Sequence, residues 1–332
     1  MQKNRDYGAS LEGRKPKKEV VKQWQSRQQR RPDTRRNSEK EGLQKSMQDA
    51  FRGATPRLPQ VKKAAKPPEV AAAVNSSVIE GTEASRRLCE EISLLSGGTC
   101  FLGFSRGKDS VVSWLYLRQF FHTIIPFHCA TVPHLSFADE SLKYYEDFFQ
   151  TKIIRCLSGE TTECISALVY QPIEDEEKID KLQLYKYGNT EIVNILRAEY
   201  GADYWVAYGM SQTDSIVRRS MRRMVDGTSE RLNVFYPCFD WTRAQIMGAI
   251  DSAGLKLADD YLIANRSLAG LPNYRHLKRF EEVFLEDFKT LELYFPFIKA
   301  ALARNEFRIE KMEKKDVKKK SKADNSTAAS TG

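Results

Sequence analysis

Between residues 76 and 310, helical patterns of apolar residues alternate with short apolar runs that are typical of buried strands. A strand, a helix and a second strand in succession form a βαβ unit, in which the strands pair in parallel and the helix covers the sheet. Strands are expected at 99–104, 124–132, 152–157, 204–208 and 233–237, and helices at 82–95, 109–121, 138–150, 189–200 and 242–253. This alternation predicts an α/β fold with a doubly wound, mostly parallel sheet of five strands.

The two ends of the chain differ in composition from its middle. Residues 1–75 are rich in Lys, Arg, Gln, Pro and Ser, and residues 311–332 form a Lys-rich run that ends in Ser, Thr and Ala. Segments of this kind cannot bury enough apolar surface to offset the entropy lost on folding. We therefore predict four regions: a disordered basic arm (1–75), an α/β domain (76–272), a C-terminal helical extension (273–310) and a disordered Lys-rich tail (311–332).

The formal net charge of +9 is unevenly distributed along the 332 residues. The first 75 residues carry +11 and residues 308–332 carry +4, whereas residues 76–307 carry −6. Basic segments bind nucleic acid without sequence preference, through counterion release. The charge therefore predicts a nucleic-acid partner for the two ends alone. The 17 Phe, 14 Tyr and 4 Trp exclude a chain that is disordered throughout.

Six cysteines, at positions 89, 100, 129, 156, 164 and 238, include no C-x-x-C pair and accompany no secretory signal. We expect reduced, mostly buried thiols in a cytoplasmic protein, and no Cys-ligated iron–sulfur cluster. No apolar run approaches the roughly 18 residues of a membrane span, so no membrane partner is expected. His122, His128 and His134 recur every six residues, but no acidic residue is spaced to complete a metal site with them.

The strongest local signal is the stretch 104–110, F-S-R-G-K-D-S, which follows the first expected strand and opens a helix. In parallel sheets, ligands bind at the carboxyl ends of the strands, and a helix N-terminus at that edge directs N–H groups and a positive dipole end toward an anion. Gly107 permits close approach of the backbone, Lys108 supplies a charge, and Asp109 is expected to cap the helix or help to hold a metal. The spacing excludes a Walker A loop, which has four residues between Gly and Gly-Lys.

Residues 105–110 resemble the S-x-G-K-D-S pyrophosphate loop (PP-loop) of the adenine nucleotide alpha-hydrolase-like superfamily, and most of all that of its phosphoadenylylsulfate (PAPS) reductase branch. Residues 208–215 resemble the family's G-x-R-x-x-E-S stretch, with Ser211 in place of Arg and Asp214 in place of Glu. Residues 237–242 resemble its P-L/I-x-D-W-T signature, and residues 128–140 keep part of its D-T-G and F-P-E-T stretches. The resemblance covers about residues 80–275.

This resemblance implies an adenine nucleotide alpha-hydrolase-like fold that binds ATP or a PAPS-type adenine nucleotide over the loop, with Mg²⁺ held through the phosphates. Arginine side chains match phosphate oxygens bidentately, so at least one of Arg218 and Arg219 is predicted to clamp the phosphates or a sulfate. The alternative for the cluster at 218, 219, 222 and 223 is a solvated basic helix face. Asp240 is expected to cap the next helix and to organise Arg218 or Arg219. The expected catalytic residues are Lys108, Asp109 and Arg218, with Asp109 also the expected metal ligand. The expected nucleotide-binding residues are Ser105, Arg106, Gly107, Lys108, Ser110, Thr131, Gly209, Asp214, Arg219 and Asp240.

Two functions from different classes are compatible with these features. The first is an enzyme that acts at the α-phosphate of ATP, by adenylation or pyrophosphate release, or on the sulfo group of an adenylyl sulfate. PAPS reductases use a cysteine in a C-terminal E-C-G-I/L-H motif, whereas the last cysteine here is Cys238, which we expect to be packed rather than reactive. The alternative is a nucleic-acid-associated or assembly protein with basic tails and a degenerate nucleotide-binding fold.

Overall fold

The structure is a computed structural model, which describes residues 78–182, 184, 188–212, 227–264, 274–309 and 311. The basic arm predicted at 1–75 lies outside the described residues. The same holds for the Lys-rich tail beyond residue 311.

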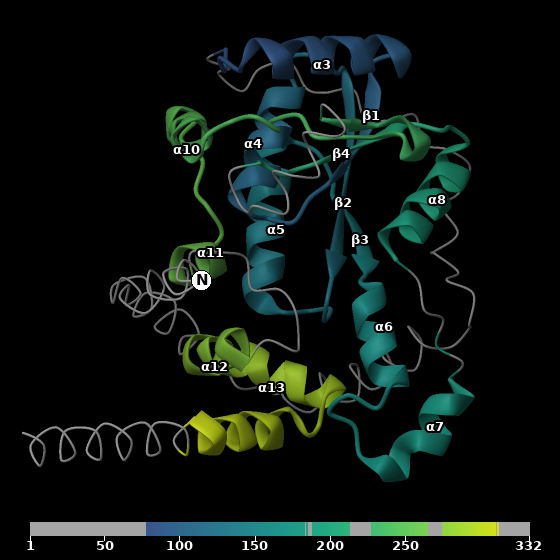
Figure 1. Ribbon diagram of the computed structural model, residues 1–332, viewed down its shortest axis with the longest axis vertical. Coiled ribbons are helices and arrows are strands. Elements are labelled where there is room, and N and C mark those ends of the chain that lie inside the picture. Colours follow the sequence, from purple (N-terminus) through teal and green to yellow (C-terminus); the bar gives the residue numbers. More distant parts are fainter. Residues whose placement is uncertain are drawn as a thin grey trace, which may run out of the picture.

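A six-stranded sheet in the order β3-β2-β1-β4-β6-β5 forms the centre of the fold (Figure 1). Five of the strands run parallel, and their bounds are β1 (Thr99–Gly103), β2 (Thr123–Ala130), β3 (Ile154–Leu157), β4 (Trp205–Tyr208) and β6 (Val234–Phe235). These are the five strands expected from the sequence, so the predicted parallel sheet is confirmed. The sixth strand, β5 (Thr228–Ser229), pairs antiparallel with β6 and is too short to show an apolar pattern.

The helices that flank the sheet also agree with the sequence pattern. They are α3 (Glu83–Leu95), α4 (Lys108–Leu117), α5 (Ser136–Phe149), α8 (Asn189–Tyr200) and α10 (Arg243–Ser252). The stretch 158–188, for which the sequence suggested no regular pattern, contains α6 (Gly159–Ser166) and α7 (Glu176–Lys181). Helix α4 ends at Leu117, four residues before its predicted end, because the chain then turns through residues 118–121 into β2.

Alternate residues of β1, β2, β4 and β6 contribute to two different hydrophobic cores. Leu102 of β1 packs into the cluster formed with α3, α4, α5 and α10. Phe101, its neighbour, packs on the opposite face with Ile192 and Leu196 of α8. Because the side chains of a strand alternate between the two faces of a sheet, this division places helices on both faces, as the doubly wound prediction requires.

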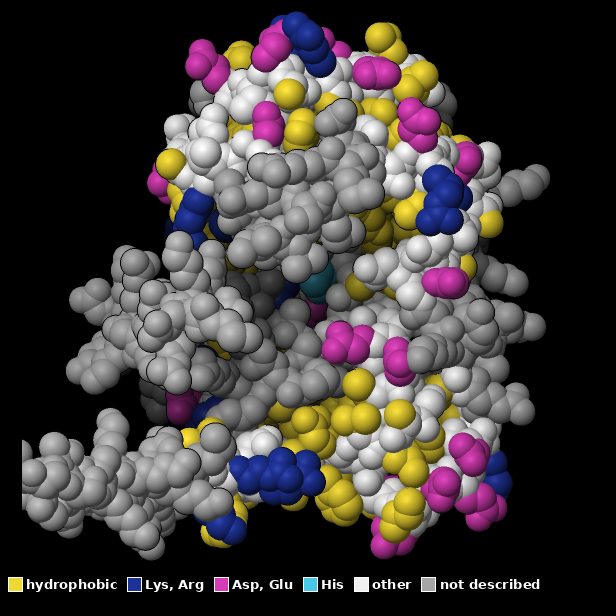
Figure 2. Space-filling model, viewed as in Figure 1, with side chains coloured by type: hydrophobic (Ala, Val, Ile, Leu, Met, Phe, Trp, Pro, Cys, Tyr) yellow, Lys and Arg dark blue, Asp and Glu magenta, His cyan; other side chains and the backbone are white. Residues whose placement is uncertain are grey.

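A third hydrophobic cluster lies beyond the carboxyl ends of the strands. It joins α6, α7 and the start of α5 to α12 (Tyr274–Val283) and α13 (Leu285–Tyr294). A short helix, α11 (Asp259–Ala264), lies between α10 and α12 in the chain. Pro296 separates α13 from the helical residues 298–309. Large apolar side chains remain exposed at this end of the molecule (Figure 2), among them Leu285, Leu293 and Phe307.

Asp287 of α13 connects this helical region to the loop that follows β2. Its carboxylate accepts hydrogen bonds from the backbone N–H and hydroxyl of Ser136, at 2.6 and 2.8 Å, and from the N–H of Phe137 at 3.3 Å. The carboxylate therefore caps α5 across some 150 residues of sequence. Burial raises the pKa of Asp287, against the effect of these hydrogen bonds.

None of the helices in the described part of the chain has both the length and the apolar composition that crossing a membrane requires.

Candidate functional site

The loop between β1 and α4 is held in shape by its own serines. The Ser110 hydroxyl donates to the carbonyl of Gly107 at 2.9 Å and accepts from the backbone N–H and the hydroxyl of Ser105, at 3.2 and 3.1 Å. Gly107 is the N-cap of α4 and offers no side chain to the helix start. The first N–H groups of a helix have no partner within it, so α4 begins with donors and a positive dipole end at the carboxyl edge of the sheet.

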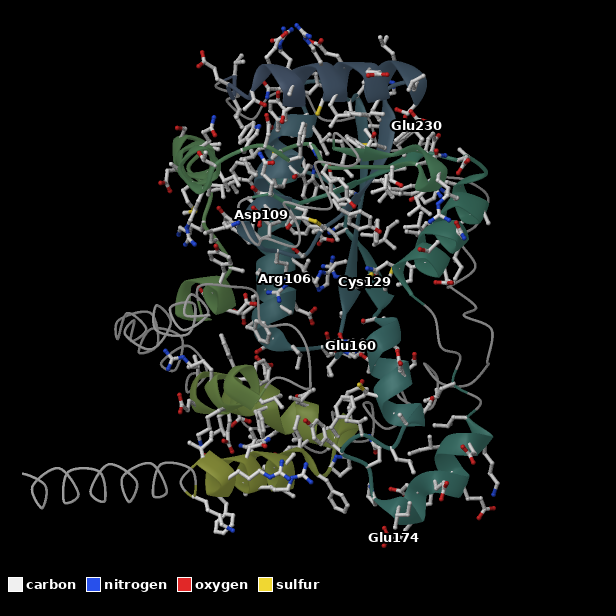
Figure 3. All side chains as sticks on the ribbon, in the orientation of Figure 1. Arg106, Asp109, Cys129, Glu160, Glu174 and Glu230 are labelled. Atoms are coloured by element: carbon white, nitrogen blue, oxygen red, sulfur yellow. The ribbon has the colours of Figure 1, made fainter. Side chains whose placement is uncertain are left out.

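Lys108 and Asp109 form an ion pair at the first turn of α4. The Lys108 Nζ lies 2.6 and 2.7 Å from the two carboxylate oxygens of Asp109, and both side chains are largely buried. Figure 3 shows Asp109 beside the strand ends. The predicted cation and the predicted metal ligand therefore bind each other, and an incoming phosphate would compete with Asp109 for the lysine.

Arg106 is directed away from the helix start, into the protein. Its guanidinium binds both carboxylate oxygens of Asp260, at 3.1 and 3.2 Å, and the Ser141 hydroxyl at 3.1 Å, and it lies 5.1 Å from the centre of the Phe137 ring. Arg106 and Asp260 are both buried, and among the described residues the Arg106 Nε has no hydrogen-bond partner. The nucleotide contact predicted for Arg106 stays a prediction, whereas its anchoring of the loop to α11 is observed.

Sequence reasoning missed Asp260. In the sequence, Asp259 and Asp260 resemble the acidic first turn of an ordinary helix, and such residues usually face solvent. Nothing in the chain marks a carboxylate that pairs with an arginine 154 residues earlier. Only the packing of α11 against α5 and the loop reveals the pair.

Gly209 follows β4 and lies directly against the first turn of α4. A Cβ atom built on Gly209 would lie 2.3 Å from the backbone nitrogen of Ser110 and 2.5 Å from the carbonyl carbon of Asp109. Since both neighbours are backbone atoms, they cannot move aside as a side-chain tip could. The requirement for glycine at this position therefore has a packing reason in addition to the predicted role in nucleotide binding.

Gly209→Ala is expected to lower the free energy of unfolding by about 1–3 kcal/mol, because the added methyl group overpacks a backbone contact. Urea denaturation measures the change. Gly248→Ala, in the middle of α10 with open space where the methyl group would lie, is the matched control and should stabilise the protein by roughly 0.5–1 kcal/mol. Equal stability of Gly209→Ala and the wild type would contradict this close contact.

Asp240 binds α3, the first helix of the described residues, rather than α10, which follows it in the chain. Asp240 accepts a hydrogen bond of 2.6 Å from the Ser85 hydroxyl of α3. The N-cap of α10 is Thr242, which accepts from the Gln245 N–H while the Gln245 side chain binds the Thr242 N–H. The prediction that Asp240 caps this helix is therefore wrong. The cap lies two residues later because the threonine and Gln245 form a reciprocal capping box.

Two further residues of the matched stretches are structural. The Ser211 hydroxyl, at the position where the family has Arg, is fully buried and donates to the Trp241 carbonyl at 2.8 Å. Cys238 is buried against Ser113, and burial raises its pKa well above the ordinary value. The prediction that Cys238 is packed is confirmed. Asp214, Arg218 and Arg219 lie outside the described residues, as do the arginines at 222 and 223.

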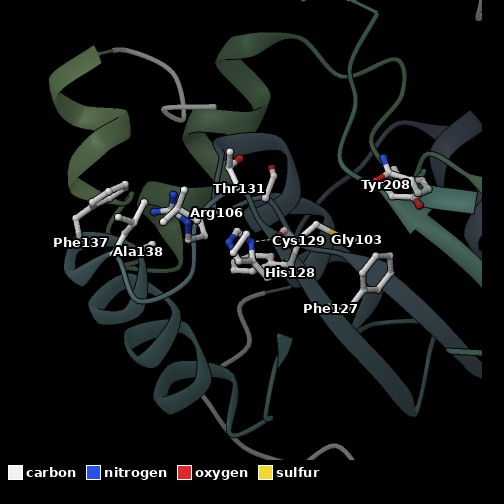
Figure 4. A pocket seen from close by; sticks show the side chains of 15 residues that line it. Gly103, Arg106, Phe127, His128, Cys129, Thr131, Phe137, Ala138 and Tyr208 are labelled. Atoms are coloured by element: carbon white, nitrogen blue, oxygen red, sulfur yellow. Dashed lines mark hydrogen bonds between the residues drawn. The ribbon is translucent and has the colours of Figure 1, made fainter. Parts of the chain in front are cut away.

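A cavity of about 250 Å³ opens at the carboxyl ends of β1, β2 and β4, next to the loop (Figure 4). Ser105 and Arg106 line it from the loop, Thr131 from the segment after β2, and Phe137 and Asn189 from the starts of α5 and α8. The Thr131 carbonyl accepts a hydrogen bond from the Thr161 hydroxyl, which orders this part of the wall. The structure therefore brings Ser105, Arg106 and Thr131 together at one cavity, while Lys108 and Asp109 lie beyond its lining.

His128 is a titratable residue of this cavity that the sequence did not single out as a nucleotide contact. Its Nδ1 lies 2.8 Å from the Phe104 carbonyl, and because a carbonyl can only accept, Nδ1 carries the proton. Burial, and then the charge of Arg106, lower the pKa of His128 to about 4. The ring is therefore neutral at pH 7, with Nε2 a hydrogen-bond acceptor. In the described part of the chain, no cluster of His, Cys, Asp and Glu has the arrangement of a metal site.

The low pKa of His128 predicts how stability changes with pH. The unfolded chain binds a proton at this residue below about pH 6.5, whereas the folded chain does so only near pH 4. Between these two pH values the unfolded chain binds one more proton than the folded chain. The free energy of unfolding therefore falls by about 3 kcal/mol as the pH is lowered from 6.5 to 4. His128→Gln should lose less stability than the wild type between pH 6.5 and 4 in denaturation curves. His122→Gln, at an exposed histidine, should keep the wild-type slope, and equal slopes for all three proteins would contradict the assignment.

Fold and site together define an α/β protein with a strand–loop–helix unit and an adjoining cavity at the carboxyl edge of a parallel sheet. Neither a protein-family model nor a curated protein sequence matches the chain.

Two solved structures resemble the fold. The NH3-dependent NAD synthetase of Campylobacter jejuni, solved with a nitrate ion, has a TM-score of 0.36 and 13% identity over 68% of this chain and 94% of its own. The U34-tRNA thiolase NcsA of Methanococcus maripaludis, solved with its 4Fe–4S cluster, has a TM-score of 0.32 and 13% identity over 66% of this chain and 81% of its own. Both likenesses concern the course of the backbone, and the expectation that this chain holds no iron–sulfur cluster stays a prediction.

Proposed function

We propose that this chain is a PP-loop nucleotide-binding enzyme of the PAPS reductase-like family. It binds ATP or an adenylyl sulfate at the carboxyl edge of the sheet and acts at the α-phosphate or on the sulfo group. The observation that carries the proposal is the S-R-G-K-D-S loop, which joins the end of β1 to the N-terminus of α4 beside a 250 Å³ cavity. We place the reaction in the cytoplasm, because cysteines stay reduced there and adenine nucleotides are available as substrates.

The cavity has the chemistry for the nucleoside half of such a ligand. The aromatic rings of Phe127 and Tyr208 supply apolar surface, and the neutral His128 supplies an acceptor for an amino group. Thr131 adds polar groups at the end of β2. A mostly apolar cavity with a few directed polar groups is typical of small-molecule sites.

The start of α4 has the chemistry for the phosphates. Its N–H groups and dipole attract an anion, and Lys108 becomes a phosphate ligand when it exchanges Asp109 for the nucleotide. These groups would stabilise the charge that develops as the α-phosphorus is attacked, so that AMP or an adenylylated acceptor forms and pyrophosphate leaves. The arginines at 218 and 219 are proposed to complete the clamp. Thiol-dependent reduction is not part of the proposal, because the chain holds no E-C-G-I/L-H motif.

Mg²⁺ would accompany the nucleotide as its phosphate complex. Sites of this kind need one or two carboxylates besides the phosphates and waters. Asp109 is placed for that task at the helix start, because its carboxylate would be released when Lys108 turns to a phosphate. We propose Asp109 as the residue that holds the ion.

Incubation of the full chain with Mg²⁺ and either ATP or PAPS, followed by chromatography of the nucleotides, tests this function. Formation of AMP from ATP would show chemistry at the α-phosphate, and formation of adenosine 3′,5′-bisphosphate from PAPS would show chemistry on the sulfo group. A chain that neither binds nor converts either nucleotide is not the proposed enzyme.

The second candidate function is that of a nucleic-acid-associated or assembly protein. The observation in its favour is the division of charge, with +11 on the first 75 residues and +4 on residues 308–332 around an acidic middle. A variant without residues 1–75 separates the two functions. Retained nucleotide turnover favours the enzyme, and a loss confined to a nucleic-acid or assembly substrate favours the alternative. If the acceptor is itself a nucleic acid, the two functions combine.

A further inference from the structure

Two cysteines face each other across neighbouring strands at the wall of the cavity. Cys129 of β2 and Cys156 of β3 are partners in register in the parallel pair. Partners in register direct their side chains to the same face of a sheet, and both cysteines belong to the hydrophobic cluster under α8. Cys129 also lines the cavity (Figure 4).

The spacing of the two residues is compatible with a bond between their sulfur atoms. Neighbouring strands lie about 4.8 Å apart, and disulfides join residues whose Cα atoms are roughly 4.4–6.8 Å apart. Among the described strands, no other two cysteines are paired in register. Cys89, Cys100 and Cys238 are buried to 2% exposure or less and do not line the cavity.

The two thiols also affect each other's acidity. A hydrogen bond from the Cys129 thiol lowers the pKa of Cys156, because it stabilises the Cys156 thiolate. The same contact, together with burial, raises the pKa of Cys129. When Cys156 is a thiolate, it can therefore accept the proton of Cys129 as the Cys129 sulfur attacks. Thiolates, rather than thiols, are the nucleophiles in disulfide exchange.

We propose that Cys129 and Cys156 form a redox dithiol site, which reacts through the cavity with low-molecular-weight disulfides of the glutathione class. The Cys129 thiol gives its proton to the Cys156 thiolate as the Cys129 sulfur attacks one sulfur of the oxidant. The oxidant's sulfur–sulfur bond breaks, and one thiolate leaves. The Cys156 sulfur then attacks Cys129 in the mixed disulfide, loses its proton to solvent, and expels the second thiolate. Two cysteines are oxidised, and one external disulfide is reduced to two thiols.

The product is expected to be readily reversible. The Cβ atoms of a disulfide lie about 3.5–4.5 Å apart, and both cysteines are held in paired strands, so the bond has to form within the fixed geometry of the β2–β3 pair. Disulfides under strain have more oxidising potentials and are easily reduced. Cys129 lines the cavity that is proposed for the nucleoside, but the thiol chemistry needs no nucleotide turnover and is tested without it.

The test is thiol counting on the full chain in glutathione buffers that range from fully reduced to fully oxidised. Each sample is quenched in acid, unfolded, alkylated and analysed by mass spectrometry. We expect all six cysteines to alkylate in the reduced buffer and only four in the oxidised buffer, with full recovery after a reductant is added. Fragment spectra should place the bond between Cys129 and Cys156. Six alkylated cysteines at every glutathione ratio, or a bond between other cysteines, would overturn the proposal.

Serine variants distinguish the cysteine that attacks the oxidant, Cys129, from the cysteine that resolves the mixed disulfide, Cys156. Cys164→Ser is the matched control. Cys164 is also buried and shares a tryptic peptide with Cys156, but it lies on α6 and faces no other cysteine in register. Cys164→Ser should still lose two alkylated thiols in the oxidised buffer. Cys156→Ser should retain a glutathione adduct on Cys129, and Cys129→Ser should gain no adduct. An adduct on Cys156 in place of Cys129 would contradict the proposed order of attack, and the wild-type count remains decisive if a variant does not fold.

Discussion

Asp260→Ala is expected to lower the free energy of unfolding by about 3–5 kcal/mol, as measured by urea denaturation. The Asp260 carboxylate is fully buried and accepts two hydrogen bonds from the Arg106 guanidinium. Its removal leaves a buried positive charge whose remaining partners, among the described residues, are the Ser141 hydroxyl and the Phe137 ring. Arg106 also has a φ of 64°, a left-handed backbone conformation that is costly for a residue with a side chain. The ion pair holds the loop in that conformation.

Two variants control this prediction. Asp251→Ala removes an exposed carboxylate from α10 and should change stability by less than about 0.5 kcal/mol. The double variant Arg106→Met with Asp260→Leu replaces both charges by apolar groups and should recover much of the loss, because no unpaired charge remains. If Asp260→Ala unfolds at the same urea concentration as Asp251→Ala, the pair does not anchor the loop.

Lys108→Ala is expected to weaken ATP binding by about 10- to 100-fold, measured by isothermal titration calorimetry. The Lys108 ammonium group lies at the start of α4, where we propose that it binds a phosphate. A hydrogen bond between charged groups contributes roughly 1.5–3 kcal/mol, so the loss of this one weakens binding by that factor. Asp109→Ala removes the residue that competes for the lysine and the proposed Mg²⁺ ligand. Its ATP binding should therefore lose the dependence on Mg²⁺ that we expect of the wild type.

Lys143→Ala provides the control for Lys108→Ala. Lys143 is an exposed lysine of α5, so its removal changes the net charge equally without touching the loop. ATP affinity should stay within about twofold of the wild type, because salt screens an exposed charge that does not contact the ligand. Unchanged ATP binding in both Lys108→Ala and Asp109→Ala would contradict the proposed site.

The order of the main strands and helices could be predicted from the sequence, because each of these longer elements has a recognisable pattern of apolar residues. The buried strand at 99–103 is a continuous apolar run, and α8 begins and ends at the predicted residues because Gly201 ends the helix in a left-handed conformation. The elements that were missed are short. The two-residue β5 pairs only because β6 lies beside it, and α7 covers six residues. No local pattern distinguishes such pieces from a loop.

The motif predicts where the site lies, since S-R-G-K-D-S after a strand indicates an anion site at the carboxyl edge of a parallel sheet. Only the tertiary structure decided what each side chain there contacts. Arg106 pairs with Asp260, Lys108 with Asp109, Asp240 with Ser85, and Cys129 with Cys156. Apart from the neighbours 108 and 109, these partners are distant in sequence. Local spacing determines backbone conformation, but contacts between distant residues depend on how helices and strands pack, and burial then decides which charges must be paired.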